Sequence, residues 1–202
     1  YFENEKNGDS KEYITKAFNR DNNDYGIRCR YSMILMQKNE YESAYTLLKQ
    51  TLNILDQKER DLIEAMKTDL KRNNKRKSND DDIKKDQQII MHHKFVCHLG
   101  CAFVKIVIMR NYREAINHLK DCDTFDYKLN VIKYFLSYSY YQIGNYDESM
   151  EWYHKFKTHI ENEESKRLKR INKGDKYETF DDVSLTMNFF KWHPYNRIQS
   201  KR

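Results

Sequence analysis

Apolar residues recur along most of the chain at the three- and four-residue spacing of amphipathic helices, with short polar breaks between the runs. From Ala102 to Ile116, an apolar run meets such a break and then continues as aromatic, polar, acidic and small residues. The same order of residue types recurs at 136–150 and at 31–45. The pattern predicts an all-α fold made of helix–turn–helix pairs.

Matching positions of the three stretches carry the same kinds of residue. A tyrosine begins the second helix of each predicted pair and a small residue follows three positions later: Tyr41 with Ala44, Tyr112 with Ala115, and Tyr146 with Ser149. The last two tyrosines are 34 positions apart. Only a small side chain lets the second helix cross closely over the first, so we predict that the three small residues are buried.

A period of 34 residues with this helix–turn–helix content resembles the tetratricopeptide repeat. The copy at about 130–163 carries the pattern most fully, whereas those at about 25–58 and 96–129 depart from it at several positions. No copy has the closing proline of the family, because the single proline is Pro194. The resemblance implies a right-handed helical solenoid of stacked antiparallel helix pairs, which binds other proteins and usually carries no chemistry.

The pattern divides the chain into six segments. They are a leading helix at 1–24, repeats at 25–70, 83–129 and 130–176, a charged insertion at 71–82, and a C-terminal segment at 177–202. Each repeat has one lengthened helix, and the last of these is basic. The C-terminal segment is expected to cap the array or to fill its groove.

The insertion at 71–82 is a basic block followed by an acidic block, with no hydrophobic side chain. Such a tract buries too little apolar surface to offset the entropy cost of ordering it. We interpret it as a solvated linker between two lengthened helices at about 41–70 and 83–110. The alternative is a nuclear-localisation or phosphate-binding patch over Lys71–Lys77, which the neighbouring aspartates would oppose.

Composition agrees with a helical fold. The 202 residues include only five glycines and one proline, too few turn residues for an all-β protein. The longest apolar stretch, about 95–109, is interrupted by His98 and Lys105. A bilayer span needs about 20 apolar residues, so we interpret this stretch as a buried helix and expect no transmembrane segment.

The four cysteines all lie within predicted helices: Cys29, Cys97, Cys101 and Cys122. Disulfide-stapled secreted domains place theirs in loops, so we expect reduced thiols and a cytoplasmic or nuclear location. A targeting segment ahead of Tyr1 would change that expectation. His93, Cys97 and Cys101 share a helix face, but one helix rarely supplies a full ligand set. Small buried cysteines are the preferred interpretation, and we expect no metal.

In the tetratricopeptide family, the first helix of each repeat lines a concave groove. The corresponding positions here are almost all apolar: Arg30, Met33 and Met36; Cys101, Val104 and Val107; Tyr134, Phe135, Tyr138 and Tyr141. Arg30 is the only cation among them, so the carboxylate clamp of chaperone-binding members is not expected. We predict that a helix or extended segment of a partner protein binds this groove, unless residues 178–195 of the chain fill it.

A second binding mode rests on charge. The net charge is +6, and a basic run extends the last predicted helix: Lys166, Arg167, Lys169, Arg170 and Lys173. Such a patch could contact RNA or an acidic membrane surface. Lysine and arginine at a helix end are also favoured by the helix dipole alone, so this mode is the alternative and not the main prediction.

The sequence gives little support to an enzymatic activity or a cofactor. It has no phosphate-binding glycine loop, no nucleophile elbow and no His-Glu-x-x-His run. Asp121, Asp123 and Asp126 lie near a predicted turn, where acids commonly cap the following helix. We therefore predict a non-catalytic interaction scaffold or adaptor that works as a subunit of a larger complex.

Overall fold

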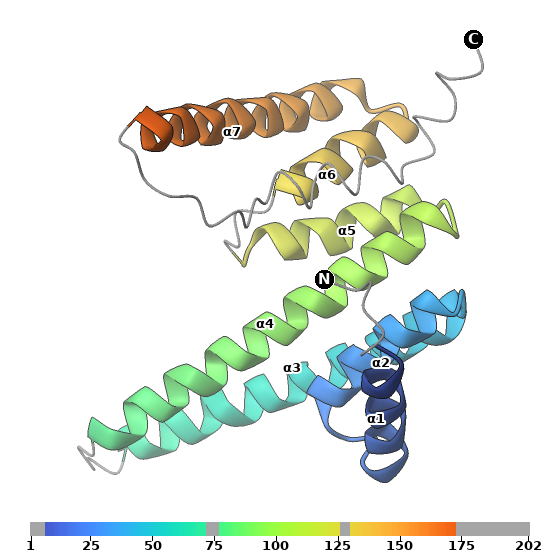
Figure 1. The fold of residues 1–202 in the computed structure, drawn as a ribbon. Helices are drawn as coiled ribbons and strands as arrows, with labels where there is room; N and C mark the ends of the chain where they lie inside the picture. The colour runs from blue at the N-terminus through green and yellow to red at the C-terminus, as the bar shows by residue number, and fades with distance from the viewer. Residues whose placement is uncertain (1–6, 72–76, 126–129, 173–202) are drawn as a thin grey trace. The chain divides into compact units, whose positions relative to one another are not determined.

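The computed structural model describes residues 7–71, 77–125 and 130–172, and over these ranges the chain is all-α, as predicted (Figure 1). The helices and the short turns that join them account for all of the described residues. The elements are α1 (Asn7–Arg20), α2 (Tyr25–Gln37), α3 (Tyr41–Lys71), α4 (Lys77–Val107), α5 (Tyr112–Asp123), α6 (Asn130–Gln142) and α7 (Tyr146–Asn172).

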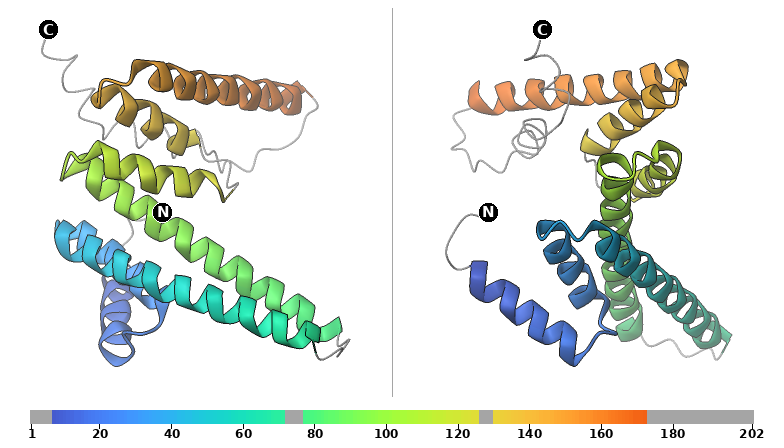
Figure 2. Two further views of the ribbon diagram at one scale, coloured as in Figure 1. Left: turned by 180° about the vertical axis from the view of Figure 1, so that it is seen from behind. Right: turned by 90° about the vertical axis from the view of Figure 1, so that its right-hand side faces the viewer.

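The chain forms two compact units, residues 1–125 and 126–202. In the first unit α1 packs on α2, α2 on α3, α3 on α4, and α4 on α5. The long helices α3 and α4 pack on one another, and the left view of Figure 2 shows them side by side. In the second unit α6 packs on α7. We call α2–α3, α4–α5 and α6–α7 pairs one, two and three.

The turns inside the three pairs share a left-handed residue at the same position before the second helix. The residue two positions before each second helix has a positive φ: Asn39 (63°), Arg110 (51°) and Gly144 (78°). A left-handed residue at this point ends a helix because it lets later amides reach the last carbonyls. The Glu40 amide donates to the Leu35 carbonyl at 2.9 Å, and the Asn145 amide donates to the Tyr140 carbonyl at 3.0 Å. In pair two, where the turn is one residue longer, the Asn111 amide donates to the Lys105 carbonyl at 2.9 Å. The polar breaks seen in the sequence are therefore helix caps, equivalent in pairs one and three and extended by one residue in pair two.

Burial follows the same register in all three pairs. The predicted crossing residues Ala44, Ala115 and Ser149 are buried, which confirms that prediction. Two further sets occupy matching positions and are also buried: Leu35, Ile106 and Tyr140, then Thr51, Cys122 and Phe156. The opening tyrosines differ, since Tyr41 and Tyr112 are half-buried whereas Tyr146 is exposed.

The insertion is shorter than the sequence suggested. Helix α3 continues to Lys71 and α4 begins at Lys77, so 77–82 belong to a helix and not to a linker; residues 72–76 lie outside the described residues. Asp82 forms an ion pair with Lys85 at 3.5 Å.

The core of the first unit lies where α2, α3 and α4 meet. Its buried members are Cys29, Leu48, Leu52, Leu55, Ile90, Cys97 and Cys101. Gly100 allows α3 to approach α4 there, because a Cβ atom at this position would lie 2.8 Å from Leu48 Cδ1. Pair one is thus joined to pair two through Leu48.

Helix α4 is also long and apolar enough, over Asp82–Val107, to cross a membrane by length and composition alone. Core helices pass the same test. Phe95, Cys97, Cys101 and Val104 are buried, and Lys105 pairs with Glu114 of α5 at 2.7 Å. This packing favours a core helix, as the sequence suggested for this stretch.

Candidate functional site

Pair three carries an exposed apolar surface that we call the tyrosine face. It consists of Tyr141 (54% exposed), Tyr146 (60%), Met150 (53%) and Tyr153 (45%). The last three lie four and three residues apart on α7 and therefore share one side of that helix. Tyr141 of α6 joins them, because its ring centroid is 5.5 Å from that of Tyr146.

One position of this surface is buried in the other two pairs. Tyr153 occupies the position that Leu48 occupies in pair one and Leu119 in pair two, and both leucines are fully buried. Leu48 is buried because the next pair packs on it at Gly100. A position that joins one pair to the next is therefore open in pair three, among the residues that the structure describes.

The sequence indicated this surface only in part. Tyr141 belongs to the groove predicted from the sequence, whereas Tyr146 was singled out there only as the tyrosine that begins a second helix. The structure leaves Tyr146 and Tyr153 exposed as well. One difference in the sequence marks this surface. Position 153 carries a tyrosine, whereas the matching positions of the other two pairs carry leucine.

The predicted groove residues fall into three groups. Cys101, Val104 and Phe135 are buried, so in this structure they are packing residues and not contact residues for a partner. Met36, Tyr134 and Tyr138 are half-buried, and the Tyr134 ring packs 5.6 Å from Phe156. The remaining four are exposed: Arg30, Met33, Val107 and Tyr141.

The exposed groove residues belong to different units. Arg30, Met33 and Val107 lie in residues 1–125, and Tyr141 lies in residues 126–202. A groove that runs through all three pairs therefore remains a prediction.

The predicted basic patch lies at the end of α7. Lys166 is exposed. Arg167, Lys169 and Arg170 belong to the same helix, but their side chains lie outside the described residues, as does Lys173 altogether. The nucleic-acid or membrane alternative therefore stays a prediction from the sequence.

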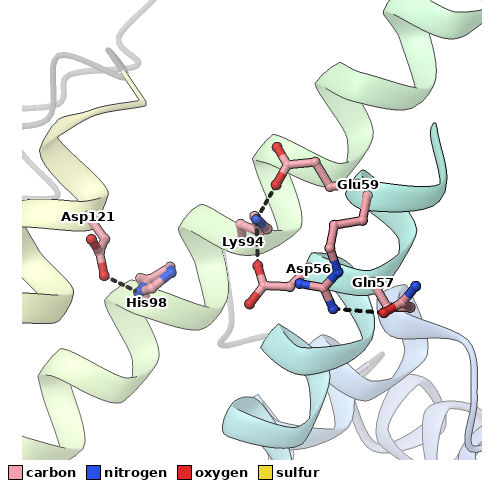
Figure 3. Close-up of polar contacts among 7 residues, drawn as sticks. Asp56, Gln57, Glu59, Lys94, His98 and Asp121 are labelled. Carbon is pink, nitrogen blue, oxygen red and sulfur yellow. Dashed lines mark hydrogen bonds and ion pairs between the residues drawn. The ribbon is translucent and has the colours of Figure 1, made fainter. Parts of the chain in front are cut away.

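Buried charges in the first unit are paired. The Lys94 ammonium lies 2.6 Å from Asp56 and 2.6 Å from Glu59, which reach it from α3 (Figure 3). Burial alone would lower the pKa of Lys94, but the hydrogen bonds to Asp56 and Glu59 outweigh burial and raise it. Arg28 donates to Thr51 and Gln50 and to the Asn22 carbonyl. Satisfied pairs of this kind are structural and offer no free acid or base.

A second polar cluster joins α4 to α5. His98 Nδ1 lies 3.1 Å from His118 Nδ1 and 3.2 Å from Asp121 Oδ2. Figure 3 shows His98 and Asp121 pointing toward one another from the two helices. Burial, followed by the neighbouring His98, lowers the pKa of His118 to about 4. Burial also lowers the pKa of His98, although Asp121 opposes that shift.

The sequence did not reveal this cluster, because the two histidines are twenty positions apart. The spacing of His98 and Asp121 around the turn could have indicated this cluster. His98 precedes the turn at Arg110 by nearly as many residues as Asp121 follows it, and an antiparallel pair places such residues at one level. Asp121 was instead interpreted as part of a capping cluster with Asp123 and Asp126, and Asp126 lies outside the described residues.

The cysteines behave as predicted in one respect: all four are free thiols and buried. Cys29 Sγ and Cys97 Sγ lie 3.4 Å apart, between α2 and α4. Burial raises the pKa of Cys101 to about 12 and raises that of Cys122 as well. His93, which shares a helix face with Cys97 and Cys101, places Nδ1 2.8 Å from the Ile89 carbonyl.

Neither a scan against protein-family models nor a search of the curated proteins gives a match for this chain.

Proposed function

We propose that this protein is a non-catalytic interaction protein of the tetratricopeptide type, which binds a helix of a partner protein on the tyrosine face of pair three. The single observation that carries the proposal is the exposure of Tyr153 at the register position where Leu48 joins pair one to pair two. A partner helix would occupy the place that α4 takes against α3.

The chemistry of the face supports a protein ligand. Tyrosine and methionine supply large apolar area, and the phenolic hydroxyls of Tyr141, Tyr146 and Tyr153 supply hydrogen bonds at the edge. Aromatic residues of this kind dominate the energy of protein interfaces because they bury much surface at small entropy cost. An apolar patch rimmed by polar side chains is typical of interaction sites. The exposed Asp147 and Glu151 provide part of such a rim.

The proposal keeps one element of the groove predicted from the sequence. Tyr141 belongs both to that groove and to the tyrosine face, and it is exposed. Phe135, another residue of the predicted groove, is buried and is not part of the tyrosine face. A partner that contacts Tyr141 can therefore extend over the tyrosine face or into the predicted groove.

The test places a photo-crosslinking amino acid at Tyr153 of the full chain in its host cell. We expect one partner polypeptide to be captured there and not at the control position Lys155, which is exposed two residues further along α7 and therefore lies on another side of that helix. With that partner purified, Tyr153→Ala should weaken binding by about 1–3 kcal/mol, as for a typical interface hot spot, with little dependence on salt.

Two outcomes would contradict the proposal. Cross-links from Tyr153 that form only to residues 178–195 of the same chain would mean that the chain covers its own face. Binding that falls steeply with salt and ignores Tyr153→Ala would instead favour the charge-driven alternative, because phosphate contacts release counterions.

A further inference from the structure

We propose that His98, His118 and Asp121 form a binding site for a divalent transition-metal ion of the Zn²⁺ class. The site joins α4 to α5 within pair two, and it is independent of the proposed partner surface.

The helices bring the three donors together from two directions. His118 and Asp121 are three residues apart on α5, so they share one side of that helix. His98 approaches the same side from α4, which packs on α5 along its length. The donor atoms of all three side chains lie within 4.8 Å of one another.

The distances agree with a shared ion. Zn²⁺ binds nitrogen and oxygen at about 2.0–2.1 Å, and a tetrahedron of such bonds separates neighbouring donors by about 3.3 Å. The two shorter separations here are 3.1 Å between the histidine Nδ1 atoms and 3.2 Å from His98 Nδ1 to Asp121 Oδ2. The donors of His118 and Asp121 lie within 4.8 Å of one another, so side-chain rotation must shorten that separation before one ion contacts all three.

The donor set selects the class of metal. Two imidazole nitrogens and one carboxylate oxygen are borderline ligands that suit Zn²⁺ and its transition-metal neighbours. Ca²⁺ and Mg²⁺ prefer sites made of oxygen alone. The adjacent Cys122 does not complete the site, because its thiol points to the Phe95 carbonyl at 3.8 Å. Three protein ligands leave the fourth position to water.

The surroundings permit entry and hold the ligands in place. The His98 side chain is largely buried against Phe125, whereas more than half of Asp121 is exposed and leaves the site open on one side. Lys94, one turn before His98, does not oppose a cation strongly because Asp56 and Glu59 already neutralise its charge.

A direct hydrogen bond between neutral histidine rings is the competing explanation for the same geometry. The two explanations differ in stoichiometric metal binding, so the full chain is first stripped of metal with a chelator. Zn²⁺ is then titrated by calorimetry, and Co²⁺ by visible absorption. We expect one Zn²⁺ per chain, and Co²⁺ bands of a four-coordinate site without thiolate charge transfer.

Asp121→Asn is the informative variant, because it removes the charge of a half-exposed side chain without changing its size. It should weaken Zn²⁺ binding by at least about tenfold, since loss of even an outer-shell partner commonly costs 10–100-fold. Asp123→Asn is the matched control, with the same change two residues along α5 at an exposed position, and should leave the affinity unchanged.

Ring-nitrogen NMR on the unaltered chain provides a readout that needs no variant. Zn²⁺ should shift the Nδ1 resonances of His98 and His118 together. The absence of saturable Zn²⁺ binding would overturn the proposal. So would equal affinities of the Asp121→Asn and Asp123→Asn chains, or thiolate charge-transfer bands in the Co²⁺ form.

Discussion

Lys94 shows how single residues stabilise the first unit. Its side chain is 12% exposed, and two carboxylates of α3 hold its charge. An ammonium taken out of water is costly unless it is paired, so this triad fixes α4 against α3 through its pairing as well as through apolar contact.

Replacing Lys94 with methionine should lower the free energy of unfolding by about 1–2 kcal/mol. Removing one partner of a buried pair costs more than that, but Asp56 and Glu59 are partly exposed and water compensates them. The measurement is urea unfolding followed by circular dichroism. Lys85→Met is the control on the same helix, since Lys85 is exposed and its loss should change stability by less than about 0.5 kcal/mol. Equal effects of the two substitutions on the free energy of unfolding would mean that the triad does not stabilise the first unit.

The same lysine predicts a pH dependence. Its pKa lies above the ordinary value of 10.5 in the folded chain, so the stabilisation is complete below that value and is lost as the pH rises through the folded pKa. The stability difference between the unaltered chain and Lys94→Met should stay constant from about pH 7 to about pH 10 and then shrink. A difference that already shrinks near neutral pH would contradict this assignment.

At the scale of elements, the helix pair is the repeating unit of the molecule. Each pair combines a left-handed residue in its turn with a small buried residue in the first turn of its second helix. The turn sets the direction in which the second helix leaves, and the small residue lets it cross the first helix closely.

Gly144 offers the cleanest test of the turn. Its φ is 78°, and a Cβ atom added there would meet nothing within 4 Å, so Gly144→Ala introduces backbone strain alone. We expect it to lower the free energy of unfolding by about 1–2 kcal/mol. Arg110→Gly at the matching position of pair two should have the opposite sign, because it relieves the same strain. Thermal melts of both variants would check this, and two changes of the same sign would refute it.

Ala115 tests the helix crossing. It is fully buried, so Ala115→Leu should overpack α5 against α4 and cost about 1–3 kcal/mol. Ala65→Leu on α3 is the matched control, because Ala65 is exposed and the same substitution there needs no room. Chemical denaturation compares the two. An Ala115→Leu chain as stable as the Ala65→Leu chain would show that the register of pair two is wrong.

At the scale of the whole molecule, the chain divides into two compact units. The first has its own core at the junction of α2, α3 and α4, and a second buried cluster of Leu35, Ala44 and Leu47. Phe18 of α1 packs on that cluster and stacks on Tyr31, with ring centroids 4.2 Å apart.

A fragment of residues 1–125 should therefore fold by itself. Its two buried clusters consist of residues from α2, α3 and α4, so we expect a helical spectrum and a cooperative thermal transition. Circular dichroism and calorimetry of the fragment give the measurement, with the full chain as reference. A fragment that melts without cooperativity would mean that the second unit contributes to the core of the first.

The sequence by itself determined the helices, their turns and the residues buried at the crossings. These features depend on interactions within a few residues: the apolar period along one helix, the left-handed turn residue, and the small side chain of Ala44, Ala115 or Ser149. The start of α4 was the exception, because the charged composition of 77–82 suggested a linker whereas α4 extends over these residues.

Only the tertiary structure decided which apolar residues remain exposed and which polar residues meet. Cys101, Val104 and Tyr141 all fit a groove by spacing, yet the first two are buried and the third is open. His98 reaches His118 and Asp121 only because α4 and α5 pack with these sides facing. The period of a helix defines its faces, but the neighbour that each face meets depends on contacts between residues far apart in the chain, which no local pattern encodes.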